Sequence, residues 1–124
     1  MAYRLNWSPS ARYDLRAIFA YIAEDDSVAA GKFTRGVIEA VERLPDFPQS
    51  GRIVPEIGDP LVRELIRQPC RIIYRINSEQ ESLEIVRVWH AAREKVDIQT
   101  PLDRLRDQTD PAVSSHALRK SLGF

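Results

Sequence analysis

The most regular pattern of apolar and polar residues lies in the second half of the chain. Residues 70–76 read CRIIYRI and residues 82–90 read SLEIVRVWH, and the polar residues NSEQE separate the two runs. β-Branched and aromatic residues favour strands and a short polar segment favours a turn, so the pattern predicts an antiparallel hairpin. Residues 62–66 are expected to form a third strand that ends before Pro69, because proline has no N–H to donate to a sheet.

The first strand of this hairpin should have one apolar and one partly polar face. Side chains alternate across a strand, so Arg71, Ile73 and Arg75 share one face. The other face is continuously apolar and is expected to lie on the core. It consists of Cys70, Ile72, Tyr74 and Ile76.

The polar turn also predicts a register between the two strands. If the turn closes with Ile76 opposite Leu83, Arg71 lies opposite Val88. His90 then falls on the same face as Arg71. A shift of one residue would reverse the faces of the second strand, because side chains alternate with a period of two.

Helical periodicity marks the first half of the chain. Ser8 and Pro9 are typical of a helix start, with serine as the N-cap and proline at the first helical position. Apolar residues then recur at helical spacing until the acidic residues 24–26. A second apolar stripe spans residues 30–44 and ends at Pro45. The polar turn between the two stripes is short, so the pattern predicts an antiparallel helical hairpin.

The order of these elements predicts an α+β fold. Residues 3–7 alternate and should form an N-terminal strand, and residues 46–60 are dense in proline and glycine and should be a loop. The expected architecture is this strand and an antiparallel two-helix hairpin packed on a small antiparallel β-sheet. Residues 1–96 form the predicted domain, and residues 97–124 form an extension of short helices or disordered chain.

Composition narrows the classes of function. The chain has 124 residues, and its 18 Lys and Arg balance its 18 Asp and Glu. Nucleic-acid binders usually carry a basic surface, so any such contact must come from a local arginine cluster or through another macromolecule. With one cysteine, Cys70, no internal disulfide can form, and a reducing compartment is indicated.

Several signals are missing from the sequence. It has no apolar run of membrane length and no signal-peptide pattern, so a cytoplasmic location without membrane contact is expected. No metal-ligand spacing and no glycine-rich phosphate loop is present, so neither a metal nor a cofactor is expected.

Four motifs in the same order resemble the RelE/ParE toxin superfamily of bacterial type II toxin–antitoxin systems. They are DLRAIFAYIAED at residues 14–25, FPQSGR at 47–52 (the family's P-x-x-G-R), the strands at 62–76, and IVRVWH at 85–90 followed by Arg93. The resemblance implies a small α+β toxin of the plasmid-stabilisation type. It also implies a cognate antitoxin that wraps the toxin and neutralises it.

The family divides into two mechanisms. RelE-like members cut mRNA in the ribosome, and ParE-like members poison DNA gyrase. As a RelE-like ribonuclease, the chain would use Arg71 on phosphate, His90 as acid or base, Arg93 on phosphate and Glu56 as base. Three further arginines are candidates for contacting the target or a phosphate. They are Arg52, Arg75 and Arg87.

The sequence departs from the RelE branch in ways that favour ParE. RelE-like toxins carry lysines on the strand before the hairpin, whereas this chain has Val62, Arg63 and Glu64. Residues 91–92 are alanines where the RelE branch has a basic residue. Gyrase poisoning is therefore the favoured function, and mRNA cleavage and an inactive member are the alternatives. Arg71 and Arg75 could instead have a purely structural role, as ion-pair partners of Glu64 or Glu84.

An antitoxin needs an apolar surface on the toxin. The aromatic residues of the helical hairpin cannot all fit beneath it, so part of them should be exposed and form the antitoxin site. They are Tyr13, Phe19, Tyr21 and Phe33. The apolar residues of the extension are expected to dock on the domain or to make a homodimer contact, and disorder is the alternative.

Overall fold

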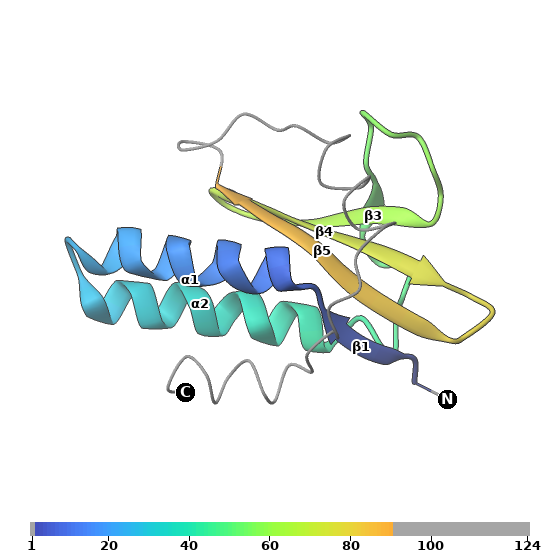
Figure 1. The fold of residues 1–124 in the computed structure, drawn as a ribbon, viewed down its shortest axis with the longest axis horizontal. Coiled ribbons are helices and arrows are strands. Elements are labelled where there is room, and N and C mark those ends of the chain that lie inside the picture. The colour runs from blue at the N-terminus through green and yellow to red at the C-terminus, as the bar shows by residue number, and fades with distance from the viewer. Residues whose placement is uncertain (1, 91–124) are drawn as a thin grey trace.

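The computed structural model describes residues 2–90, which form two helices and five strands (Figure 1). In chain order these are β1 (Arg4–Trp7), α1 (Pro9–Ala23), α2 (Ser27–Glu42), β2 (Arg52–Ile53), β3 (Val62–Arg67), β4 (Cys70–Asn77) and β5 (Ser82–His90). The two helices lie side by side and form a layer on one face of the sheet (Figure 1). The predicted α+β architecture is confirmed, whereas the predictions for residues 91–124 lie outside the described residues.

Both helices begin at side chains that cap them. The Ser8 hydroxyl accepts a hydrogen bond from the Ala11 N–H at 3.0 Å, and Pro9 follows as the first helical residue. The Asp26 carboxylate accepts hydrogen bonds from the N–H groups of Val28 and Ala29, each at 3.0 Å. These caps satisfy N–H groups that have no partner within the helix. None of the helices in the described residues is long and apolar enough to cross a bilayer.

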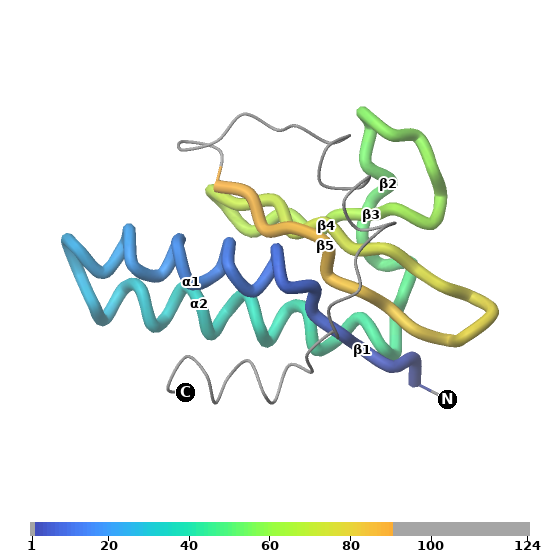
Figure 2. Tube along the Cα trace, viewed as in Figure 1, coloured from blue at the N-terminus to red at the C-terminus, as the bar shows by residue number. Residues whose placement is uncertain are grey.

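The sheet has the strand order β1-β5-β4-β3-β2. The predicted antiparallel sheet is confirmed for β2 to β5, and the N-terminal strand β1 joins it by pairing parallel to β5. Figure 2 shows β1 beside the first half of β5, where Arg4–Trp7 pair with residues 82–85. The helical hairpin lies between them in sequence and supplies the crossover that parallel strands need.

The register of β4 and β5 follows the prediction near the turn and departs from it beyond a bulge. Ile76 lies opposite Leu83, as predicted. The register shifts between Ile73 and Tyr74, because β5 there contains one residue more than β4. An extra residue reverses the faces of everything beyond it.

The bulge corrects the predicted position of His90. Arg71 lies opposite Trp89 instead of Val88, and Cys70 lies opposite His90. His90 therefore lies on the helix-facing side of the sheet with Cys70. The prediction that it shares a face with Arg71 is wrong.

The core lies between the helices and the sheet. Tyr74 and Ile72 are fully buried there, which confirms the predicted face of β4. A second, smaller cluster lies on the other face, called the outer face from here on. Its buried members are Val54, Val62, Ile73, Val86 and Trp89.

Candidate functional site

A buried carboxylate organises the charged residues of the outer face. The Glu64 side chain on β3 has no exposed surface, and its two oxygens accept hydrogen bonds from Arg52 Nε and Arg71 Nε, each at 2.6 Å. A buried carboxylate is costly without such partners. Glu64 therefore fixes the position of an arginine on each of the two neighbouring strands.

The other end of Arg71 is also occupied. Its Nη1 and Nη2 atoms donate to the two carboxylate oxygens of Glu56, at 2.7 and 3.0 Å. This is the two-pronged geometry that arginine makes with carboxylates and phosphates. The hydrogen bond from Arg71 lowers the pKa of Glu56 below its ordinary value, and Glu56 and Glu64 together raise the pKa of Arg71. Glu56 is thus held ionised, with its oxygens already engaged.

The remaining arginines of β4 and β5 are paired as well. Arg75 donates to Glu84 at 3.2 Å. Arg87 donates to both oxygens of Asp14 on α1, at 2.6 and 2.8 Å, and the Val88 N–H donates to the same carboxylate at 2.9 Å. Arg87 therefore fastens α1 to the edge of β5. The structural alternative, in which Arg71 and Arg75 pair with Glu64 and Glu84, is confirmed for both arginines.

His90 lies apart from these arginines. It is buried on the helix-facing side, where its ring meets the edge of the Tyr21 ring with the centroids 5.6 Å apart. Arg71 and His90 are separated by the thickness of the sheet and cannot contact one phosphate. Arg93 lies outside the described residues. Of the predicted catalytic set, the structure brings together Arg71 and Glu56.

The P-x-x-G-R loop is held by the core tyrosine. The Tyr74 hydroxyl donates to the Pro48 carbonyl at 2.7 Å and accepts a hydrogen bond from the Gly51 N–H at 2.9 Å. A Cβ at Gly51 would lie 2.6 Å from the Tyr74 oxygen and from the Glu64 carbonyl oxygen, so only glycine fits. Arg52 follows directly and reaches Glu64. The loop motif and the R-E-L segment of β3 are therefore parts of one structure.

The aromatic residues predicted to bind an antitoxin differ in exposure. Tyr13 is 73% exposed and Tyr21 is 44% exposed on α1, whereas Phe19 and Phe33 are partly buried and Phe33 packs on the core. Phe47, at the start of the loop motif, is 65% exposed and was not among the predicted residues. Its sequence signal was an aromatic residue inside a proline- and glycine-rich loop, away from any amphipathic stripe.

Possible metal ligands are scattered. Across residues 2–90, no three His, Cys, Asp or Glu side chains are grouped so that they could hold a metal ion. Burial raises the pKa of the Cys70 thiol to about 12, which leaves it protonated and unreactive as a nucleophile at neutral pH.

The family comparison matches the fold and the motifs. A family model described as the ParE toxin of a type II toxin–antitoxin system, parDE, matches residues 5–95. The chain belongs to this toxin family. The match includes both helices and all the paired charges described above, and the arrangement of Arg52, Glu64 and Tyr74 is thus part of a ParE-type toxin domain.

Two related proteins carry toxin names. The chain is 35% identical over 88 residues to putative toxin Y4kP of Sinorhizobium fredii, covering 71% of this chain and 88% of the relative. It is 32% identical over 87 residues to toxin RelE2 of Caulobacter vibrioides, covering 70% of this chain and 93% of the relative. These relatives place the chain in the RelE/ParE superfamily.

Solved structures share the fold. The chromosomal ParDE toxin–antitoxin system from P. aeruginosa aligns with a TM-score of 0.58 and 26% identity, over 72% of this chain and 96% of that one. The RelBE2 toxin–antitoxin complex from Mycobacterium tuberculosis aligns with a TM-score of 0.53 over 73% of this chain and 99% of that one, and at 22% identity it supports the fold alone. The ParE-family chain is thus the toxin component of a type II toxin–antitoxin system.

Proposed function

We propose that this ParE-family toxin arrests growth by poisoning DNA gyrase and does not cut mRNA. The observation that carries the proposal is the pairing of Arg71, Arg75 and Arg87, each with a carboxylate of the same chain. A surface on which arginines are neutralised in this way is a poor cradle for a polyanion. It is compatible with binding a protein target.

RNA cleavage makes chemical demands that this arrangement meets poorly. The 2′-hydroxyl must lose a proton, the phosphate must be stabilised by cations, and the leaving oxygen must gain a proton. Glu56 has a lowered pKa and is engaged by Arg71, which makes it a weak general base. His90 lies on the opposite face from Arg71 and cannot act on a phosphate held there.

The antitoxin is proposed to bind at α1. Tyr13 and Tyr21 lie two turns apart on this helix and are both exposed. Aromatic residues supply large contact areas at protein interfaces, and an amphipathic helix of the antitoxin is the partner that the family implies. Phe19 and Phe33 are proposed to support this surface from partly buried positions.

The test is expression of the toxin alone in a bacterium. We expect growth arrest, filamentation and the DNA-damage response, with cellular mRNA intact, and rescue by a co-expressed antitoxin. Arg71→Ala and His90→Ala variants are compared after circular dichroism and antitoxin binding establish that they fold. If wild-type toxin cuts mRNA at ribosomal A-site codons and both variants lose that activity, the chain is an mRNA interferase and the gyrase proposal fails.

A further inference from the structure

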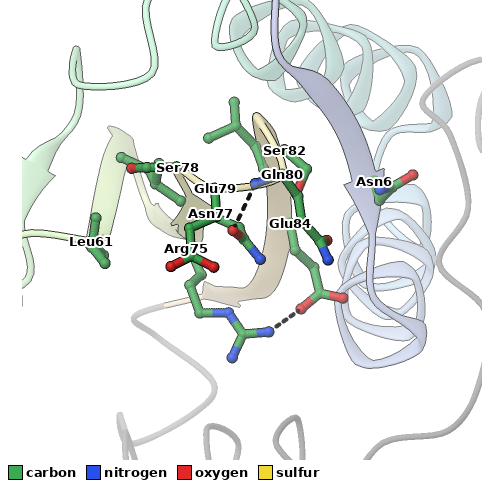
Figure 3. Close-up of a pocket in the computed structure, with 11 residues that line it drawn as sticks. Asn6, Leu61, Arg75, Asn77, Ser78, Glu79, Gln80, Ser82 and Glu84 are labelled. Carbon is green, nitrogen blue, oxygen red and sulfur yellow. Dashed lines mark hydrogen bonds and ion pairs between the residues drawn. The ribbon is translucent and has the colours of Figure 1, made fainter.

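A polar cavity lies at the turn end of the β4–β5 hairpin, away from the Glu56–Arg71 pair. It has a volume of about 690 Å³, is open to solvent on one side and is called the hairpin cavity here (Figure 3). The polar side chains lining it include Asn6, Arg75, Asn77, Ser82 and Glu84. Its volume falls in the range of sites that bind small organic molecules.

Three of these side chains form a row across three neighbouring strands. Asn6 of β1 lies opposite Glu84 of β5, and Glu84 lies opposite Arg75 of β4. Side chains directly opposite one another in a sheet lie within contact distance on the same face. Figure 3 shows the row, with the ion pair between Arg75 and Glu84 and with Asn6 on the strand beyond.

The row has hydrogen-bonding capacity that the described residues do not use. Arg75 and Glu84 share one contact of 3.2 Å, longer than the 2.6 Å that Glu64 makes with each of its arginines. The second Glu84 oxygen and the Asn6 amide have no hydrogen-bond partner in the described part of the chain. Partial burial raises the pKa of Glu84 against the opposing effect of Arg75, a property common at binding sites.

We propose that the hairpin cavity binds a guanine base through its Watson–Crick edge and the neighbouring N3 atom. The row offers, in order, a donor from the Asn6 amide, two acceptor oxygens from Glu84, one of which also accepts from Arg75, and a further donor from Arg75. Guanine offers the complement, which is the O6 acceptor, the N1–H and N2–H donors and the N3 acceptor. Adenine, cytosine and uracil lack two adjacent donors flanked by acceptors.

Charge and shape support a neutral, planar ligand. Arg75 and Glu84 together carry no net charge, so the row offers no net electrostatic attraction to a free cation or a free anion. Leu61 is 45% exposed at the wall of the cavity and offers apolar contact to the face of a base. The site shares the Arg75–Glu84 pair with the paired arginines on which the proposed function rests, but none of its residues belongs to the Arg52–Glu64–Arg71–Glu56 cluster, so guanine binding here neither requires nor excludes gyrase poisoning.

The test is titration of the full chain with nucleotides, followed by NMR of its backbone amides. GMP is expected to shift the signals of Asn6, Arg75 and Glu84. IMP, which lacks the exocyclic amine, should bind about tenfold more weakly, because one hydrogen bond to a charged group is lost. AMP should produce no saturable shift.

Variants locate the site. Glu84→Gln replaces an acceptor with a donor and should weaken GMP binding about tenfold or more. Asn6→Ala should weaken it as well, and it serves as a second variant if Glu84→Gln does not fold. Glu79→Gln removes a charge at the edge of the same cavity without touching the row, so it should bind GMP like the wild type.

Single-stranded oligouridines with one central guanosine or adenosine test whether the bound guanine comes from a nucleic acid or from a free nucleotide. Tighter binding of the guanosine strand than of GMP indicates a base within nucleic acid, and equal binding indicates a free nucleotide. Both outcomes support the proposal. It is overturned if AMP binds as well as GMP, if millimolar GMP shifts none of the three signals, or if the folded variants of Glu84 and Asn6 bind GMP like the wild type.

Discussion

Replacing Tyr74 with phenylalanine removes one oxygen atom and leaves the packing of the ring unchanged. That oxygen donates to the Pro48 carbonyl and accepts from the Gly51 N–H, both within the P-x-x-G-R loop. Tyr74 is fully buried, so water cannot readily replace these bonds. The variant therefore isolates the contribution of the hydroxyl to holding the loop that positions Arg52.

The expected cost follows from the groups left without partners. An unsatisfied buried donor or acceptor costs about 1–3 kcal/mol, and we expect a loss of about 2 kcal/mol in the free energy of unfolding. For a domain of this size that corresponds to a melting temperature about 10 °C lower. Tyr74→Ala also removes the ring and should cost about 3–5 kcal/mol.

The dependence on pH gives a second readout. Burial raises the pKa of Tyr74 in the folded protein. The unfolded chain then releases the phenolic proton at a lower pH than the folded chain does, so wild-type stability falls as the pH rises above about 10. The phenylalanine variant lacks this group, and the difference between the two proteins should narrow at alkaline pH.

Urea denaturation and thermal melting measure both effects. Tyr13→Phe is the matched control, because Tyr13 is largely exposed, and it should change stability by less than about 0.5 kcal/mol. If Tyr74→Phe unfolds at the same urea concentration as the wild type, the hydroxyl does not hold the loop and the reasoning is refuted.

Three further predictions concern the loop, the outer face and the extension. Gly51→Ala should cost about 1–3 kcal/mol in urea denaturation, because its Cβ would lie 2.6 Å from the Glu64 carbonyl oxygen, and unchanged stability would contradict the close approach. Glu56 has a lowered pKa, so the stability it contributes is present above its ordinary pKa and is lost as the pH falls through the pKa of the folded state. Glu56→Gln should flatten this part of the plot of stability against pH. If the slope stays the same, the Glu56–Arg71 pair is not the cause of this pH dependence. Truncation after Lys95 should lower the melting temperature or the mass measured by light scattering, and if neither changes, docking and homodimer formation by the extension are both excluded.

Local signals in the sequence predicted most of the fold. Ser8, Pro9 and the apolar stripes act within a few residues, and α1 begins where these signals place it. The β4–β5 turn is also local, and its closing pair of Ile76 and Leu83 was predicted. The parallel pairing of β1 with β5 joins residues far apart in the chain, and nothing in either segment alone indicates it.

The candidate site was predictable in part. Pairing of Arg75 with Glu84 follows from the register at the turn. The position of His90 was not predictable, because one extra residue in β5 reverses its face and no glycine marks the bulge. The burial of Glu64 was also missed, since its carboxylate is satisfied by Arg52 and Arg71, which lie on two other strands.

The most direct test of gyrase poisoning is a supercoiling assay with purified gyrase, relaxed plasmid and the full chain. We predict that the toxin inhibits supercoiling and traps cleaved plasmid, that Arg71→Ala retains a substantial part of this activity, and that the cognate antitoxin abolishes it. Full supercoiling in the presence of excess folded toxin that still arrests growth in cells would contradict the account and assign the toxin a different target.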